Sequence, residues 1–136
     1  MYKTLLTSNL ALIAILAMGV QAHAGDIVVV MGPGSAALSK DQVANVYLGR
    51  NNSLKPMDLP GSNPLRDAFY KKATDRDRPQ IKAVWSRLTF TGQGQPPKEL
   101  SDSAAIKKAV AADPKAVGYI DKADVDGSVK VVLALN

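Results

Sequence analysis

The chain has no cysteine and a single histidine, His23, among its 136 residues. Without cysteine it has no disulfides, no thiolate nucleophile and no cysteine-ligated zinc. His23 falls in a segment that we expect to be removed, so the remaining chain also lacks an imidazole for a general base or a catalytic triad. These absences argue against an enzyme. They favour a non-catalytic binding protein that uses no cofactor and no metal.

Residues 1–24 have the pattern of a secretory signal peptide. Lys3 supplies the positive start, Leu10–Val20 is an apolar run, and Ala22-His23-Ala24 gives a small-x-small cleavage site. The apolar run is too short to cross a bilayer, which takes about 20 residues. We therefore expect one exported domain over residues 25–136, located in the bacterial periplasm.

The charge balance is basic, with a formal net charge of +5. Basic residues between Arg66 and Lys82 alternate with Asp67, Asp75 and Asp77. This mixing indicates a solvated surface with charges of both signs, and it argues against nucleic acid as a partner. The excess of positive charge favours small anions, anionic lipid surfaces or acidic partners.

Strands and helices are predicted to alternate along the domain. The apolar run in 26–31 is typical of a strand buried on both faces, as in a parallel sheet. Pro56 cannot donate to a ladder, which favours an edge position for the short strand 54–59. Together the patterns indicate a three-layer α/β/α single lobe. The expected elements are strands at 26–31, 54–59, 117–120 and 129–135, and helices from 39 to 49, after 63, after 78 and over 101–112.

Apolar residues at helical spacing mark the expected core. Ser39 with Gln42 forms a capping-box pattern at the start of the first helix. Phe69 falls on the apolar face of the helix after Asn63. In the next helix Trp85 lies in an apolar stripe, so we expect it in the core. The loop 93–97 is either a recognition surface or a simple connector.

Gly61-Ser62-Asn63, followed by Pro64, is the best candidate site. Asn63 fits an N-cap and Pro64 the first helical position. Free backbone N–H groups, the Ser62 hydroxyl and the positive end of the helix dipole together form a cradle suited to an anion. From these residues alone, plain helix capping is the competing interpretation.

Several short segments, in order along the chain, resemble phosphate-binding receptors of ABC transporters. The resemblance covers nearly all of residues 25–136 and concerns the second lobe of these periplasmic proteins. Gly61-Ser62 and Arg66-Asp67-Ala68-Phe69 match a turn, a helix and a phenylalanine of the family, with one extra residue between the two segments. The other matching segments are Val46-Tyr47-Leu48-Gly49-Arg50, Trp85, Phe90-Thr91-Gly92 and Gly118-Tyr119-Ile120.

The resemblance implies the second domain of a type II periplasmic binding fold. It also implies an oxyanion site formed by Gly61, Ser62, Asn63 and Arg66. Asp58 stands where the family carries an arginine that clamps the oxyanion. A carboxylate there would repel phosphate unless a nearby arginine compensates for its charge.

Two functions follow as expectations. The first is a solute-binding role related to phosphate transport, in which the lobe binds phosphate or a similar oxyanion weakly. The alternative is a non-catalytic periplasmic interaction or signalling module that has lost ligand capture. Such a module would dock on a membrane transporter or a sensor protein. A homodimer that sets two half-cradles face to face is a further candidate assembly.

Overall fold

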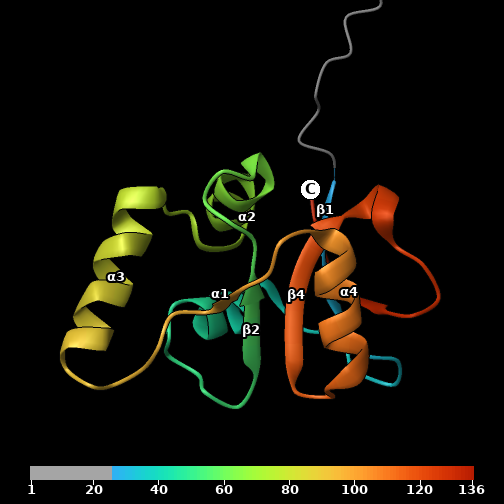
Figure 1. The fold of residues 1–136 in the computed structure, drawn as a ribbon, viewed down its shortest axis with the longest axis horizontal. Coiled ribbons are helices and arrows are strands. Elements are labelled where there is room, and N and C mark those ends of the chain that lie inside the picture. Colours follow the sequence, from blue (N-terminus) through green and yellow to red (C-terminus); the bar gives the residue numbers. More distant parts are fainter. Residues whose placement is uncertain (1–25) are drawn as a thin grey trace, which may run out of the picture.

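The computed structural model describes residues 26–136, and the predicted signal peptide over residues 1–24 lies outside them. Figure 1 shows a central sheet with helices on both of its faces. The expected three-layer α/β fold is therefore confirmed. The elements in chain order are β1 Ile27–Met31, α1 Lys40–Tyr47, β2 Lys55–Asp58, α2 Pro64–Thr74, α3 Arg78–Phe90, β3 Lys98–Glu99, α4 Ser103–Ala112, β4 Ala116–Asp121, the short 3₁₀ helix η1 Lys122–Asp124 and β5 Lys130–Leu135.

The five strands form one mixed sheet in the order β3-β2-β4-β1-β5. All five residues of β1 are buried, as its apolar run predicts. The parallel pairing expected for β1 is wrong, because it runs antiparallel to both β4 and β5. An apolar run shows that both faces of a strand are covered, but it carries no information on the direction of the neighbouring strands.

The predicted edge position of β2 also needs correction. β2 lies between β3 and β4 and is parallel to both. Pro56 is tolerated because the ladder is short on either side. Lys55 and Pro56 pair with β4, whereas Met57 and Asp58 pair with the two residues of β3. Pro56 therefore faces no partner strand on the β3 side.

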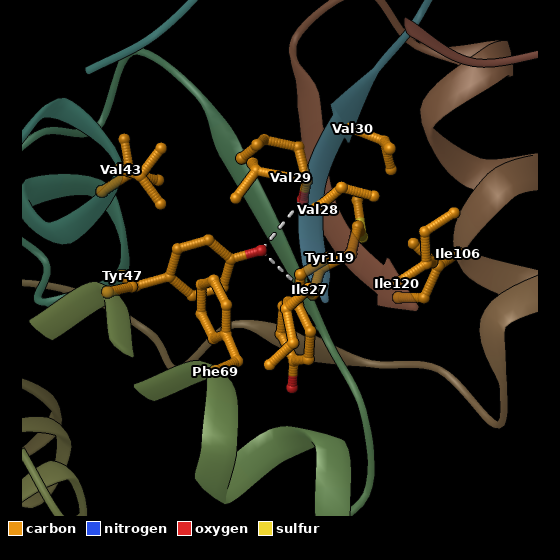
Figure 2. Packing of buried hydrophobic residues seen from close by; sticks show 14 of the residues in the cluster. Ile27, Val28, Val29, Val30, Val43, Tyr47, Phe69, Ile106, Tyr119 and Ile120 are labelled. Carbon is orange, nitrogen blue, oxygen red and sulfur yellow. Dashed lines mark hydrogen bonds between the residues drawn. The ribbon is translucent and has the colours of Figure 1, made fainter. Parts of the chain in front are cut away.

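Helix α4 covers one face of the sheet, and α1 with α2 covers the other. Figure 2 shows Ile106 and Ile120 on the α4 side, and Tyr47 and Phe69 on the opposite side. On that side the Tyr119 ring stacks on Phe69 with ring centroids 3.9 Å apart. Tyr47 donates its hydroxyl to the carbonyl oxygens of Met57, at 2.7 Å, and of Val117, at 3.3 Å. The buried aromatic residues thus join the helical layer to β2 and β4.

The predicted helix starts are confirmed by their caps. Ser39 and Gln42 exchange the two hydrogen bonds of a capping box. The Asn63 side chain accepts from the Leu65 backbone N–H, with Pro64 at the first helical position. Asp77 and Gln80 form a second capping box that starts α3. Each cap depends on neighbouring residues only, which is why the sequence pattern could identify the caps at Ser39 and Asn63. The Asp77–Gln80 box was not predicted.

Helix α3 stands away from the sheet at one side of the molecule (Figure 1). Trp85 is buried, as predicted, and its indole N–H donates to the Tyr47 carbonyl oxygen at 3.1 Å. Phe90, at the end of the helix, is 93% exposed. Across the part of the chain that the structure describes, no helix combines the length and the apolar character that crossing a membrane requires.

Candidate functional site

A cleft of about 740 Å³ lies between the start of α2, the face of α3 that carries Ile81 and Trp85, and the segment leading to β3. Below it is called the α2–α3 cleft. Its apolar lining is formed by Ile81, Trp85, Phe90, Pro96 and Pro97, and its charged lining comes from α2, α3, β2 and β3. The charged residues that line it are Asp58, Arg66, Asp67, Arg78, Lys82 and Glu99. Acidic and basic groups are thus equal in number within it.

Asp58 lines the buried end of this cleft, and only 1% of its surface is exposed. Tyr70 donates its hydroxyl to Asp58 Oδ2 at 2.6 Å, and Tyr119 donates to Oδ1. The backbone N–H of Leu59 also donates to Oδ1, at 2.9 Å. A buried carboxylate is stable only when it is hydrogen-bonded or paired, and these donors meet that requirement.

Burial and the neighbouring carboxylate keep the tyrosine hydroxyls protonated. Loss of solvent, followed by the charge of Asp58, raises the pKa of Tyr70 and of Tyr119 far above the usual value. The same two causes raise the pKa of Tyr47. All three phenols therefore remain hydrogen-bond donors across the physiological range of pH.

Arg66 completes the surroundings of Asp58. Its Nε lies 3.7 Å from Asp58 Oδ2, and its Nη1 lies 2.7 Å from Glu99 Oε1. Nη1 also donates to the Leu59 carbonyl oxygen at 3.3 Å. Burial alone would lower the pKa of Arg66, but the neighbouring acidic groups, Asp58 foremost, leave that pKa raised. The resemblance to phosphate receptors implied that the Arg66 guanidinium binds an external anion. In the structure this group is paired with the carboxylates of Asp58 and Glu99 instead.

The other three predicted site residues lie together at the start of α2, beside the same cleft. Ser62 is exposed, Gly61 is half-buried, and the Asn63 side chain caps the helix. If Gly61 carried a Cβ, that atom would lie 3.9 Å from Arg66 Nη1 and 3.7 Å from Arg78 Nη1. The structure therefore brings Gly61 and Arg66 together, while Asn63 uses its side-chain oxygen within the helix.

Arg78 is a site residue that the sequence did not single out. Its Nη2 donates to Asp67 Oδ2 at 2.8 Å and to the Gly61 carbonyl oxygen. The only sequence signal was its place before Pro79 at a helix start, which gave no reason to expect contact with Gly61. Arg78 connects α3 to the turn before α2, and so it fixes one wall of the cleft.

The segment before β3 forms the other wall. Pro97 is buried, whereas Pro96 and Gln95 are exposed. Gly94 packs close to Trp85, since a Cβ at that position would lie 3.6 Å from its Cζ3 atom. Among residues 26–136 no three acidic or histidine side chains gather closely enough to hold a metal ion. The cleft can therefore contact an apolar group beside a set of charges that are largely paired already.

These features describe a mixed α/β domain with a charged cleft beside its sheet, and comparison with known proteins agrees on the fold. No family model and no curated protein matches the chain. Solved structures do match. An ABC-type phosphate transport receptor from Vibrio cholerae superposes with a TM-score of 0.61 at 17% sequence identity, over 79% of this chain and 45% of that one.

A second match is a Clostridium perfringens protein assigned as a phosphate ABC transporter substrate-binding protein, solved with bound phosphate. Its TM-score is 0.63 at 19% identity, over 79% of this chain and 44% of its own. The chain thus spans about half the length of the solved structures it matches. The predicted resemblance to phosphate receptors is confirmed at the level of fold, since the described residues superpose on about half of such a receptor.

Proposed function

We propose that this chain is an exported, non-catalytic interaction module built on the lobe of a phosphate receptor, and that it binds a protein partner instead of capturing phosphate. The observation that carries this proposal is the position of Asp58. This buried carboxylate accepts from two tyrosine hydroxyls and a backbone N–H, and it lies beside Arg66. It supplies, from within the chain, the negative charge that an oxyanion would otherwise bring.

Charge balance supports the same conclusion. A phosphate entering beside Gly61 would have to compete with Glu99 for Arg66 and with Asp67 for Arg78, at contacts of 2.7 and 2.8 Å. It would also approach Asp58, Asp67 and Glu99, all of which line the cleft. Like charges within a few ångströms disfavour each other, so displacement would cost part of what the new contacts contribute.

The α2–α3 cleft supplies a surface for a partner. Phe90 is 93% exposed at its rim, beside Trp85 and Pro96. Exposed aromatic residues next to arginine are enriched where proteins bind one another. We propose that a periplasmic or membrane protein, such as a transporter or a sensor, places an apolar side chain here while its polar groups meet Lys82 and Glu99.

A site-specific phosphate titration followed by NMR tests the loss of capture. We expect the backbone amides of residues 61–66 to keep their chemical shifts up to tens of millimolar phosphate. Asp58→Asn, which removes the internal charge, should make the same amides respond. Shifts at 61–66 in the unmodified chain that vanish in Ser62→Ala would overturn the proposal and restore the solute-binding interpretation.

Binding of a partner is tested with a photo-crosslinking residue in place of Phe90. In cells, we expect a specific crosslinked product. The amount of this product should fall when Lys82→Glu reverses the charge at the rim of the cleft. The control places the same crosslinker at Ser128, an exposed residue that does not line this cleft. Equal products from both positions would contradict a docking role for the cleft.

Oxyanion binding at Gly61, Ser62, Asn63 and Arg66 remains the second candidate function, with a role in phosphate uptake. One observation favours it, because Arg66 and Arg78 both place a terminal nitrogen within 4 Å of the position of a Gly61 Cβ. Two guanidinium groups at a helix N-terminus form a recognised kind of anion site. The titration above distinguishes the two functions directly.

A further inference from the structure

The five arginines of the chain fall into two groups that differ in their partners. Arg66 and Arg78 line the α2–α3 cleft, and each forms a salt bridge with at least one carboxylate. The other three are Arg50, Arg76 and Arg87. Within residues 26–136, none of these three has a carboxylate oxygen within 4 Å of its guanidinium nitrogens, and none donates a side-chain hydrogen bond to the protein.

These three arginines line one hollow of about 310 Å³, here named the arginine hollow. They arrive from separate parts of the chain: Arg50 follows α1, Arg76 lies in the turn between α2 and α3, and Arg87 lies in the last turn of α3. The floor is apolar and consists of Leu48, Val84 and Leu88. No acidic side chain is among its lining residues.

The acidic residues nearest in sequence are occupied elsewhere. Asp75 lies 3.3 Å from Lys71 Nζ, and the Asp77 side chain accepts from the Gln80 backbone N–H at the start of α3. A second hollow of about 480 Å³ shares Arg50 and Arg76, but Asp41 and Asp75 also line it. Positive charge without a counter-charge is therefore concentrated in the smaller hollow.

Helix ends explain part of this arrangement. A cation near a helix C-terminus interacts favourably with the helix dipole, and each of these arginines lies in or just past the last turn of a helix. That preference accounts for one arginine at each helix end. It does not account for three of them lining the same hollow, where their mutual repulsion raises the energy unless an anion neutralises it.

We propose that the arginine hollow binds a phosphate ester, with the phosphate held by Arg50, Arg76 and Arg87 and a small organic group resting on Leu48, Val84 and Leu88. Guanidinium groups match the geometry of phosphate oxygens and can donate to two of them at once. The volume of about 310 Å³ is at the small end of the range for ligand sites. This site is separate from the start of α2, and the proposal does not depend on the function proposed above.

The ester has two sources, a free metabolite or the headgroup of an anionic lipid, and the test separates them. The purified chain is titrated with phenyl phosphate and with inorganic phosphate, followed by NMR of its backbone amides. In a parallel arm it is mixed with phosphatidylglycerol vesicles or phosphatidylcholine vesicles and sedimented. We expect phenyl phosphate to shift amides of residues 48–50 and 84–88, and to bind more tightly than inorganic phosphate because it also contacts the floor.

The variant Arg50→Gln/Arg76→Gln/Arg87→Gln should weaken phenyl phosphate binding by about tenfold or more. A matched control, Lys108→Gln/Lys115→Gln/Lys122→Gln, removes three exposed positive charges away from the hollow and should change binding by less than about twofold. Circular dichroism checks that both variants fold, and Arg87→Gln alone provides a milder change if the triple arginine variant does not.

Specific binding to phosphatidylglycerol vesicles that the arginine variant loses would identify a lipid headgroup as the source of the ester. Binding of phenyl phosphate without vesicle binding would identify a free ester. Three results would overturn the proposal: no shifts at these amides with either ligand and no vesicle binding, shifts confined to residues 61–66, or equal losses in the arginine and lysine variants.

Discussion

Among residues 26–136, Asp58 is the one charged residue that is fully buried. Its carboxylate joins β2 to α2 through Tyr70 and to β4 through Tyr119. Removing one member of a buried, hydrogen-bonded cluster leaves its partners unsatisfied, which costs more than the loss of a surface ion pair. Asp58 is therefore a structural residue as well as the internal counter-charge of Arg66.

We predict that Asp58→Asn lowers the free energy of unfolding by about 2–4 kcal/mol, because the amide cannot accept from both tyrosines and no longer balances Arg66. Chemical denaturation measures the change. The matched control is Asp67→Asn, whose carboxylate is half-exposed and pairs with Arg78. That change should cost less than about 1 kcal/mol. Equal costs for the two variants would show that the buried contacts of Asp58 add no stability.

A second prediction at this scale concerns alkaline pH. Folding raises the pKa of Tyr47, Tyr70 and Tyr119, so their stabilising contribution is complete below the unfolded pKa of about 10 and declines as pH rises above it. Together they should reduce stability by up to about 4 kcal/mol for each pH unit. Absorbance at the phenolate wavelength should report their ionisation only together with unfolding by circular dichroism. Ionisation of all three in the folded chain would contradict the burial of their hydroxyls.

Sequence reasoning identified residues whose role depends on near neighbours. The caps at Ser39 and Asn63 are read from three or four positions, and the predictions held. The surroundings of Asp58 were not predictable in this way, because Tyr119 lies 61 residues further along the chain. Asp58 was noted only as an obstacle to phosphate, and its pairing with two tyrosines depends on how distant elements come together.

At the scale of elements, the contact of α4 with β4 is set by a missing side chain. A Cβ on Gly118 would lie 2.5 Å from Ile106 Cγ2 and 3.5 Å from Val110 Cγ1. Glycine therefore lets the helix approach the strand closely. The sequence showed Gly118 as part of an apolar strand, but the closeness of α4 could not be read from that strand alone.

We predict that Gly118→Ala destabilises the fold by about 1–3 kcal/mol through overpacking. Adding Ile106→Ala removes the obstructing methyl group, so the double variant should lose less stability than the two single changes combined, by at least about 0.5 kcal/mol. Denaturation of the four chains gives the coupling. Gly127→Ala is the control, since nothing lies within 4 Å of the added atom. Simple additivity would mean that α4 shifts away from the strand instead.

Other element-level expectations failed for a shared reason. β1 was expected to be parallel to its neighbours and β2 to be an edge strand, yet β1 is antiparallel and β2 is internal. Hydrophobic pattern reports how much of an element is covered. It does not report which strand lies beside it, because strand order is decided by connections and packing across the whole domain.

At the scale of the whole molecule, the exposed apolar surface is small. Among the described residues, the large exposed apolar side chains are Phe90 and Val131, which lie on α3 and β5. Stable homodimers usually bury a larger and more continuous apolar area. The described surface therefore favours a heterologous partner over a second copy of the chain.

We predict a monomer in sedimentation velocity at tens of micromolar, both with and without phosphate. The measurement should be repeated with Phe90→Ala, which removes the largest exposed apolar side chain and should leave the sedimentation coefficient unchanged. A dimer that forms only in phosphate would contradict this prediction. Such a dimer would support a shared oxyanion site across a two-fold axis, with Gly61, Ser62, Asn63 and Arg66 of each copy facing the other.

The sheet register has a consequence for how this lobe can be joined to other sequences. Ile27 at the start of β1 pairs with Leu135 at the end of β5, so the two ends of the described domain lie side by side (Figure 1). A short linker could close them into a circle, and new termini could be opened in a surface turn such as Asp126-Gly127. For the same reason the whole lobe can be inserted into a loop of a host protein with little separation of the loop's ends. In protein engineering, the domain can therefore be inserted into different host proteins without long linkers.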